Sequence, residues 1–233
     1  MIFDAGARYN ENSDKGKSVV LPYLQSRGIH KLDGVIVSHG DNDHIGGVFS
    51  VLRAMPYSRV LSSVPEKLSA FKAEFCQAGQ QWRWDGVTFS LLSPPVGQTL
   101  GSENNRSCVL LIESRQFRFL LPGDIEQEAE NWLIEQYGEN LRVDVLIAPH
   151  HGSKTSSSDG FLQQLAPGYI LIPAGYRNRF GFPHTVVLQR YQRREIDWLT
   201  TAAAGAIIMQ TNKKRLIITA SRIKAGRYWL KAM

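Results

Sequence analysis

The stretch 38–47, Ser-His-Gly-Asp-Asn-Asp-His-Ile-Gly-Gly, places two imidazoles and two carboxylates within six consecutive residues. The apolar run 32–37 before it predicts a buried strand, and the run 48–53 after it predicts a helix. In α/β proteins such strand-to-helix loops often carry the chemistry, because the two rigid elements hold the loop between them. The stretch is therefore the first candidate site of the chain.

The spacing of these side chains suits metal coordination. Alternate side chains of an extended segment point the same way, so His39 and Asp41 can share one ligand. Asp43 and His44 can turn towards a second ligand as the helix begins. Imidazole together with carboxylate suits zinc, manganese or iron rather than a soft thiolate site. The alternative is a polar turn in which an aspartate caps the following helix.

The pattern His-x-Asp-x-Asp-His at 39–44 resembles the His-x-His-x-Asp-His signature of the metallo-β-lactamase superfamily, with Asp41 in place of the second histidine. This variant is similar to the C-terminal metal-dependent domain of ComEC, the DNA-uptake channel protein of competent bacteria. The resemblance implies an α/β fold, a four-layer αββα metallo-β-lactamase sandwich, as a single domain over residues 1–233. Residues 1–6 start abruptly for such a domain. We therefore expect that its first strand or strands are lacking and that the chain is a fragment of a longer membrane protein.

Three later segments extend the resemblance. The stretch 104–107, Asn-Asn-Arg-Ser, matches the Asn-Asn-x-Ser of ComEC-like domains, and there Asn105 is a possible metal or phosphate contact. Gly123-Asp124 matches the motif whose carboxylate bridges both metals, and 149–153, Pro-His-His-Gly-Ser, matches a motif in which His151 ligates metal and His150 faces the substrate. The alternatives are an asparagine-rich turn at 104–105 and a helix N-cap role for Asp124.

The resemblance implies two divalent metal ions that share Asp124. The implied ligands are His39, Asp41, Asp43, His44, Asp124 and His151, and the implied catalytic residues are Asp43, Asp124 and His150. Three carboxylates make this donor set harder than one of histidines alone, so manganese is favoured and zinc is possible. Asp4 resembles the aspartate of the family's first motif, which orients the metal loop; capping the turn before Gly6 is the alternative.

Candidate substrate-binding residues follow the last two motifs. Ser153 and Lys154 lie in a hydroxyl-rich loop, and the segment 175–184 joins asparagine, aromatic and arginine residues to a Pro-His pair that resembles the family's last motif. The candidates are Ser153, Lys154, Arg177, Asn178, Arg179 and His184. These arginines, with Arg190, Arg193 and Arg194, would attract a polyanionic backbone if they border the metal cleft. A solvated basic helix face is the alternative.

Composition places only weak limits on the function. The 27 Lys and Arg residues against 21 Asp and Glu residues give a formal charge of +6, which is compatible with an anionic partner but does not require one. No apolar run reaches the roughly 18 residues of a transmembrane helix, and there is no signal peptide. Cys76 and Cys108 form no metal motif and are predicted to be buried thiols.

The remaining patterns predict a strand-rich chain with short helices. Turn signals at Asp85-Gly86 predict a hairpin of the segments 81–84 and 87–92. The other predicted helices are 18–28, 65–78, 160–165 and 185–194, and the predicted C-terminal strands are 198–200, 205–209, 215–219 and 228–230.

By resemblance, the chain is a nuclease that hydrolyses DNA with a hydroxide activated by two metals, and it degrades one strand during DNA uptake in natural transformation. The implied partners are DNA, the rest of the channel chain and the uptake machinery, with no small-molecule cofactor. The parent protein would lie in the inner membrane with this domain, itself soluble, outside the cytoplasm. The alternatives are a small-molecule phosphodiesterase or phosphocholine-type esterase, and a non-catalytic DNA-binding module. A β-lactamase is disfavoured because two of the signature histidines are missing.

Overall fold

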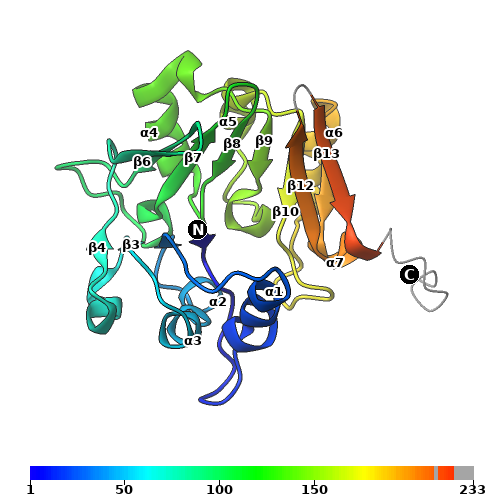
Figure 1. Cartoon of the computed structure of the whole chain (residues 1–233). Helices are drawn as coiled ribbons and strands as arrows, with labels where there is room; N and C mark the ends of the chain where they lie inside the picture. The colour runs from blue at the N-terminus through cyan, green and yellow to red at the C-terminus, as the bar shows by residue number, and fades with distance from the viewer. Residues whose placement is uncertain (213–214, 223–233) are drawn as a thin grey trace. The chain divides into compact units, whose positions relative to one another are not determined.

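The computed structural model describes residues 1–212 and 215–222 (Figure 1). It divides the chain into two compact units. The first unit comprises Met1–Gln80 and Leu91–Val109, and the second comprises Gln81–Ser90 and the chain from Leu110 onward. Each unit is described by itself below, and the expected single domain over 1–233 stays a prediction.

The sheet of the first unit has four parallel strands in the order β1-β2-β3-β4. Strand β2 is buried along its whole length, which explains its uninterrupted apolar sequence. Its carboxyl end runs directly into Ser38, so the sheet positions the candidate loop. The strands are β1 (Ile2–Phe3), β2 (Val35–Val37), β3 (Val60–Ser62) and β4 (Glu74–Phe75).

Short helices accompany this sheet. Helix α3 buries Val48, Val51 and Leu52, whose spacing places them on one face, and these residues join the apolar core that contains β2. The helices are α1 (Leu21–Ser26), α2 (Asn42–Ile45) and α3 (Val48–Ala54), with a π-helical turn at Gly16–Val20 and 3₁₀ segments at Pro65–Phe71 and Asn104–Arg106.

The Gly46-Gly47 pair between α2 and α3 is required by close backbone approach. A Cβ on Gly47 would collide with the Ala5 carbonyl and the Gly16 amide, and a Cβ on Gly46 would collide with the Arg8 amide. The Gly47 amide donates a hydrogen bond to the Gly6 carbonyl at 2.7 Å. The two glycines therefore allow the N-terminal segment to lie against the candidate loop.

The predicted helix over 65–78 is wrong beyond Phe71. Leu68 leaves helical geometry, Lys72 has a left-handed φ of 53°, and the chain then forms β4 beside β3. The Cys76 amide also donates to the Ser62 carbonyl at 2.9 Å. Pairing with a neighbouring strand thus overrides the local helical preference of this segment.

The prediction of two buried thiols is also wrong, because Cys76 and Cys108 form a disulfide. Both residues are fully buried in the first unit. The Cys108 amide donates to the Ser38 carbonyl at 2.8 Å, so the bridge joins the end of β4 to a segment that contacts the candidate loop.

The second unit contains most of a seven-stranded sheet in the order β11-β10-β9-β8-β7-β6-β5. The run β8-β9-β10-β11 is parallel, whereas β7 pairs with β8, and β5 with β6, in antiparallel fashion. The strands are β5 (Gln81–Trp84), β6 (Val87–Ser93), β7 (Val109–Glu113), β8 (Arg118–Leu121), β9 (Val145–Ile147), β10 (Tyr169–Ile172) and β11 (Asp197–Thr200). The hairpin predicted around Asp85-Gly86 is confirmed.

The helices of this unit and a separate two-stranded sheet complete the described chain (Figure 1). They are α4 (Gln127–Tyr137), α5 (Asp159–Leu165), α6 (Thr185–Arg193) and α7 (Thr201–Ala204), 3₁₀ segments at Gly138–Leu141 and Pro149–Gly152, and strands β12 (Ile207–Asn212) and β13 (Arg215–Ala220). The predicted strand 228–230 lies outside the described residues. The α/β class, with sheets flanked by helices, is confirmed.

Within residues 1–212 and 215–222, every helix is too short or too polar to cross a bilayer.

The disulfide predicts a measurable loss of stability when it is removed. Closing a loop between residues 32 apart in sequence restricts the unfolded chain, which corresponds to about 3 to 4 kcal/mol. We expect the Cys76→Ser/Cys108→Ser double variant to lose roughly that much free energy of unfolding, measured by denaturant titration. The native chain under reducing conditions is the matched control and should behave like the variant. Equal stability of the oxidised chain and the variant would contradict this account.

Candidate functional site

Asp4 holds the metal loop, residues 38–44, in the first unit. Its Oδ1 accepts a hydrogen bond from the Ser38 amide at 2.7 Å, and its Oδ2 accepts from the Ser38 hydroxyl at 2.7 Å and from His44 Nδ1 at 2.8 Å. Asp4 itself has a left-handed φ of 58°, a strained geometry typical of functional sites. Asp4 thus contacts both ends of the loop, and its orienting role towards a metal stays a prediction.

These bonds select one tautomer for both histidines of the loop. The Ser38 hydroxyl donates to Asp4, so it accepts from His39 Nδ1 at 2.9 Å, and His44 Nδ1 donates to the Asp4 carboxylate. In its neutral form, each ring then carries its lone pair on Nε2, and this is the form that ligates metal. A carboxylate or hydroxyl behind the ring is the usual support of a metal-binding histidine.

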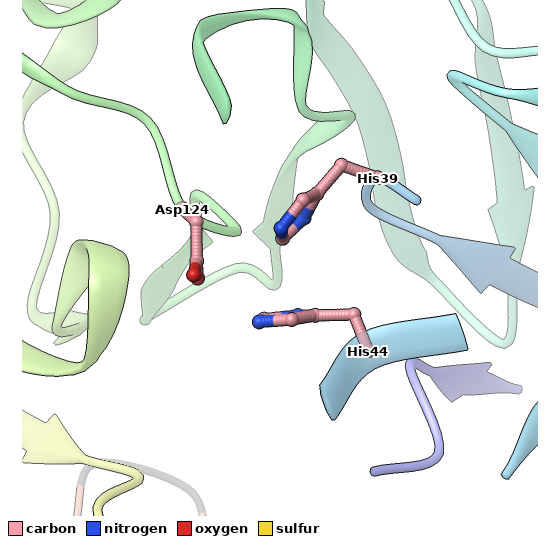
Figure 2. Close-up of side chains that lie close together, drawn as sticks. All are labelled: His39, His44 and Asp124. Carbon is pink, nitrogen blue, oxygen red and sulfur yellow. The ribbon is translucent and has the colours of Figure 1, made fainter. Parts of the chain in front are cut away.

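Figure 2 shows the rings of His39 and His44 side by side, with centroids 4.2 Å apart. Both histidines are buried, whereas the side chains of Asp41 and Asp43 are 57% and 50% exposed. His39 Nε2 lies 3.6 Å from Asp41 Oδ2, and His44 Nε2 lies 3.9 Å from Asp43 Oδ2, longer than direct hydrogen bonds. Nitrogens and carboxylate oxygens that face one another at this spacing form a donor set suited to a borderline or hard cation.

Asn105 also belongs to the first unit. It is buried in the 3₁₀ segment Asn104–Arg106, and its backbone amide donates a hydrogen bond to the Ser102 hydroxyl at 3.1 Å. A contact of its side chain with metal or phosphate stays a prediction.

Asp124 lies in the second unit, between β8 and α4 in sequence. The helix N-cap is Glu126, two residues later, so the alternative interpretation of Asp124 as the cap is wrong. Asp124 is only 4% exposed. Its role as a metal ligand stays a prediction.

His151 has the geometry of a metal ligand. Its Nδ1 donates to the Pro173 carbonyl at 2.9 Å, and its Nε2 lies 3.5 Å from Asp124 Oδ2. A backbone carbonyl behind the ring fixes the tautomer as Asp4 does for His44. Four predicted ligands of the first unit and two of the second thus share one chemical pattern, imidazole beside carboxylate.

His150 differs from His151 because carboxylates lie near both of its ring nitrogens. Its Nε2 lies 3.9 Å from Asp124 Oδ2, and its Nδ1 lies 3.5 Å from Glu126 Oε1. His150 and His151 have left-handed φ angles of 48° and 55°, which cost of order 1–3 kcal/mol each in non-glycine residues. Gly152 must also remain small, because a Cβ there would press against Pro183. Such strain is retained where the direction of the two rings matters.

Some of the predicted substrate-binding side chains are exposed, whereas others form hydrogen bonds within the unit. Lys154, Arg177 and Arg179 are exposed, and the guanidinium groups of the two arginines lie over the rings of Tyr176 and Phe180, at 5.2 and 4.7 Å. Ser153 is buried, and its hydroxyl lies 2.9 Å from that of Thr155.

Asn178 and His184 support the aromatic loop 175–184. The side-chain NH₂ of Asn178 donates hydrogen bonds to the carbonyls of Gly175 and Phe182, and its side-chain oxygen accepts one from the Phe182 backbone amide. These bonds are 2.7–3.0 Å long and join the two ends of the loop. The His184 amide donates to the Gly152 carbonyl at 3.0 Å, and its ring lies 5.3 Å from that of Phe182. Phe182 in turn lies against the rings of both His150 and His151.

The three arginines of helix α6 and its end are engaged within the unit. Arg190 donates to the carbonyls of Ser156 and Ser157 at 2.9 and 3.1 Å, and Arg193 and Arg194 pair with Asp159 at 3.6 and 3.3 Å. They hold the loop that follows the two histidines. Binding of a polyanion by these arginines stays a prediction, as does the alternative of a solvated basic helix face.

Sequence patterns missed the buried carboxylate beneath this loop. Glu130 of α4 is fully buried and accepts hydrogen bonds from the amides of Ser157 and Ser158. Burial raises the pKa of Glu130, and these hydrogen bonds and the Arg190 charge only partly oppose that effect. The hydroxyl of Tyr191 bonds the Ser157 hydroxyl at 2.8 Å, and burial raises the pKa of this phenol as well. The network makes the segment 156–158 rigid.

A comparison with protein families agrees with this geometry. The metallo-beta-lactamase superfamily matches residues 1–175. The chain belongs to this superfamily. Its membership confirms the predicted family and fold class, and the fold implies divalent-metal binding, for which the histidine and aspartate clusters described above are the candidates.

The relatives of this metallo-β-lactamase domain include competence proteins. It is 34% identical to Recombination protein 2 of Haemophilus influenzae over its full length, and 35% identical to the Competence protein ComA of Neisseria gonorrhoeae over 99% of its length. It covers 29% and 32% of those proteins, so the chain spans about three tenths of the length of these relatives. Both comparisons confirm the predicted resemblance to competence proteins.

A solved structure shows the same fold. That structure is of a protein from Parabacteroides distasonis that is assigned as a metal-dependent hydrolase. It aligns with this chain with a TM-score of 0.52 and 14% sequence identity, over 74% of this chain and 77% of that one.

The support that Asp4 gives to the loop predicts a change in metal affinity. Asp4→Asn keeps the shape and tolerates the left-handed backbone, but it cannot accept all three hydrogen bonds. We expect manganese affinity to fall about 10- to 100-fold in calorimetric titration. Asp14→Asn is the matched control, because Asp14 is another buried carboxylate of this unit and instead accepts from Ser50 at 2.6 Å. Equal affinity in the native chain and Asp4→Asn would refute the orienting role.

The raised pKa of Glu130 predicts a pH-dependent stability. The folded chain binds this proton more tightly than the unfolded chain, whose carboxyl titrates near 4.5. The stabilisation by Glu130 is therefore complete below that pH and is lost as the pH rises through the folded pKa. We expect the stability of the native chain relative to Glu130→Gln to decrease from pH 4.5 to pH 8 in denaturant titrations. A difference that stays constant over this range would show that Glu130 has no raised pKa.

Proposed function

We propose that this domain is a two-metal phosphodiesterase that hydrolyses DNA. The observation that carries the proposal is the repeated pairing of an imidazole Nε2 with a carboxylate, at His39, His44 and His151, with each Nδ1 held from behind. We assign the ligands to His39, Asp41, Asp43, His44, Asp124 and His151, with Asn105 as an additional contact. The balance of carboxylates and imidazoles favours manganese, with zinc next.

Divalent cations in such a site lower the pKa of water towards neutrality and neutralise charge on phosphate oxygens. The chain's own residues supply the remaining chemistry. His150 is directed by strained backbone towards the Asp124 side and is proposed to donate a proton to the leaving oxygen. Lys154 and the arginines of the loop 175–184 are proposed to hold the phosphates on either side of the reacting one.

Two features support DNA as the substrate. The relatives are named as a recombination protein and a competence protein. The aromatic loop 175–184 also exposes Tyr176 and Phe180, each covered by an arginine, and Phe182 joins this loop to His150 and His151. Aromatic faces and guanidinium groups together suit the bases and phosphates of a single strand.

We further propose that the domain works outside the cytoplasm, as part of a longer inner-membrane uptake protein. The buried disulfide supports this location, because disulfides persist in oxidising compartments.

The proposed function predicts manganese-dependent cleavage that requires Asp43. We expect the native chain to cleave a single-stranded oligonucleotide with manganese, and Asp43→Ala to lose at least about 100-fold in rate, since even supporting residues of metal sites contribute 10- to 100-fold. Asp33→Ala is the matched control, because Asp33 is an exposed aspartate of the same unit outside the metal loop.

A parallel assay on a small chromogenic diester separates the alternatives. Rapid turnover of that diester with intact DNA would favour a small-molecule phosphodiesterase. Salt-sensitive DNA binding without any cleavage would favour a binding module, and either result would overturn the nuclease proposal.

A further inference from the structure

A pocket of about 350 Å³ lies within the first unit, and no motif of the sequence pointed to it. Small-molecule sites in proteins begin near this size. One part of its lining is apolar and includes Phe75, Pro94 and Pro95, while another part is polar and includes Gln98 and Thr99. The pocket therefore combines apolar side chains with groups that can form hydrogen bonds.

The pocket shares a wall with the metal loop. Lys67 and Glu103 line it and form an ion pair of 2.8 Å. A Cβ on Gly40, between His39 and Asp41, would collide with both side chains, so the ion pair lies directly against the loop. Ser63, another lining residue, donates its hydroxyl to the Ser38 carbonyl at 2.8 Å. A ligand in this pocket would thus lie next to the candidate metal ligands of the same unit.

The lining carries two acidic side chains, Glu66 and Glu103, and two basic ones, Lys67 and Arg106, so their charges balance. Lys67 and Glu103 neutralise each other's charge in the ion pair between them. The groups that suit an aromatic ligand with a phosphate are Phe75 and Arg106. Arg106 is exposed, and within residues 1–212 and 215–222 its guanidinium forms no ion pair. Phe75 lies on the edge strand β4 and is 45% exposed, although it is a large aromatic residue.

We propose that this pocket binds one nucleotide of the substrate, next to the phosphodiester that is cleaved. The base stacks on Phe75 beside the two prolines, Gln98 and Thr99 bond its edge, and Arg106 binds a phosphate oxygen. The proposal rests on the proposed function, and it identifies Phe75 and Arg106 as residues that determine the substrate class. A bare phosphate or a sulfate would use Arg106 but would leave the aromatic surface without a partner.

Binding of thymidine 5′-monophosphate by the full chain tests the pocket without relying on turnover. Equilibrium dialysis is carried out with and without manganese, and inorganic phosphate serves as the second probe. We expect the nucleotide to bind more tightly than phosphate in both conditions. Phe75→Ala should weaken nucleotide binding about tenfold, within the range that one stacked base contributes, and should leave phosphate binding at its native level.

Two further variants make the result specific. Phe75→Trp retains a stacking surface and should restore nucleotide binding, which separates loss of stacking from misfolding. Tyr23→Ala is the matched control, because Tyr23 is a 49% exposed aromatic residue of the same unit outside the pocket. Arg106→Ala should weaken both probes, whereas Arg53→Ala, which removes an exposed arginine of α3, should weaken neither.

The outcomes separate this inference from the proposed function. Equal nucleotide affinity in the native chain and in Phe75→Ala would overturn the inference, whatever the nuclease assay shows. Nucleotide binding that depends on Phe75, together with intact DNA in the manganese assay, would support the pocket and reject the nuclease.

Discussion

The hydrogen bonds of the Asp4 carboxylate determine the arrangement of the metal loop. One side chain, contributed by the turn after β1, binds the Ser38 amide, the Ser38 hydroxyl and His44. Because Ser38 has a single hydroxyl proton, the same bonds decide where His39 carries its own proton. The tautomers of two imidazoles, and with them the chemistry of the loop, thus depend on a residue more than thirty positions away. The glycines at 46 and 47 matter for the same reason, since they let the N-terminal segment come close enough to form these bonds.

The histidines of the second unit are also held in defined orientations, but by different groups. A backbone carbonyl, that of Pro173, replaces the carboxylate behind His151, and strained left-handed backbone directs the two histidines. The loop after them is secured by the buried Glu130 and by Arg190. Burying a carboxylate costs free energy, which the hydrogen bonds from Ser157 and Ser158 partly offset. A rigid support of this kind is what precise placement of imidazoles requires.

The parts of the fold and site that could be predicted from sequence are those encoded by contiguous residues. The loop 38–44, the strand before it and the hairpin around Asp85-Gly86 each depend on neighbours in the chain, and short motifs identify them. The disulfide, the role of Glu130 and the pocket beside Phe75 depend on residues far apart in sequence, for which a single chain carries no local signal. The helix expected over 65–78 failed for a related reason, because pairing of β4 with β3 outweighed local preference.

The course of the chain between the two units has a consequence for dissection of the protein. The backbone leaves the first unit after Gln80, returns at Leu91 and leaves again after Val109. The bridge between Cys76 and Cys108 closes a ring around the whole ten-residue excursion 81–90. A single proteolytic cut therefore cannot separate the two units completely, because a fragment that ends at Val109 still carries residues 81–90 of the second unit. A nick inside the ring would leave both fragments covalently joined until a reductant is added.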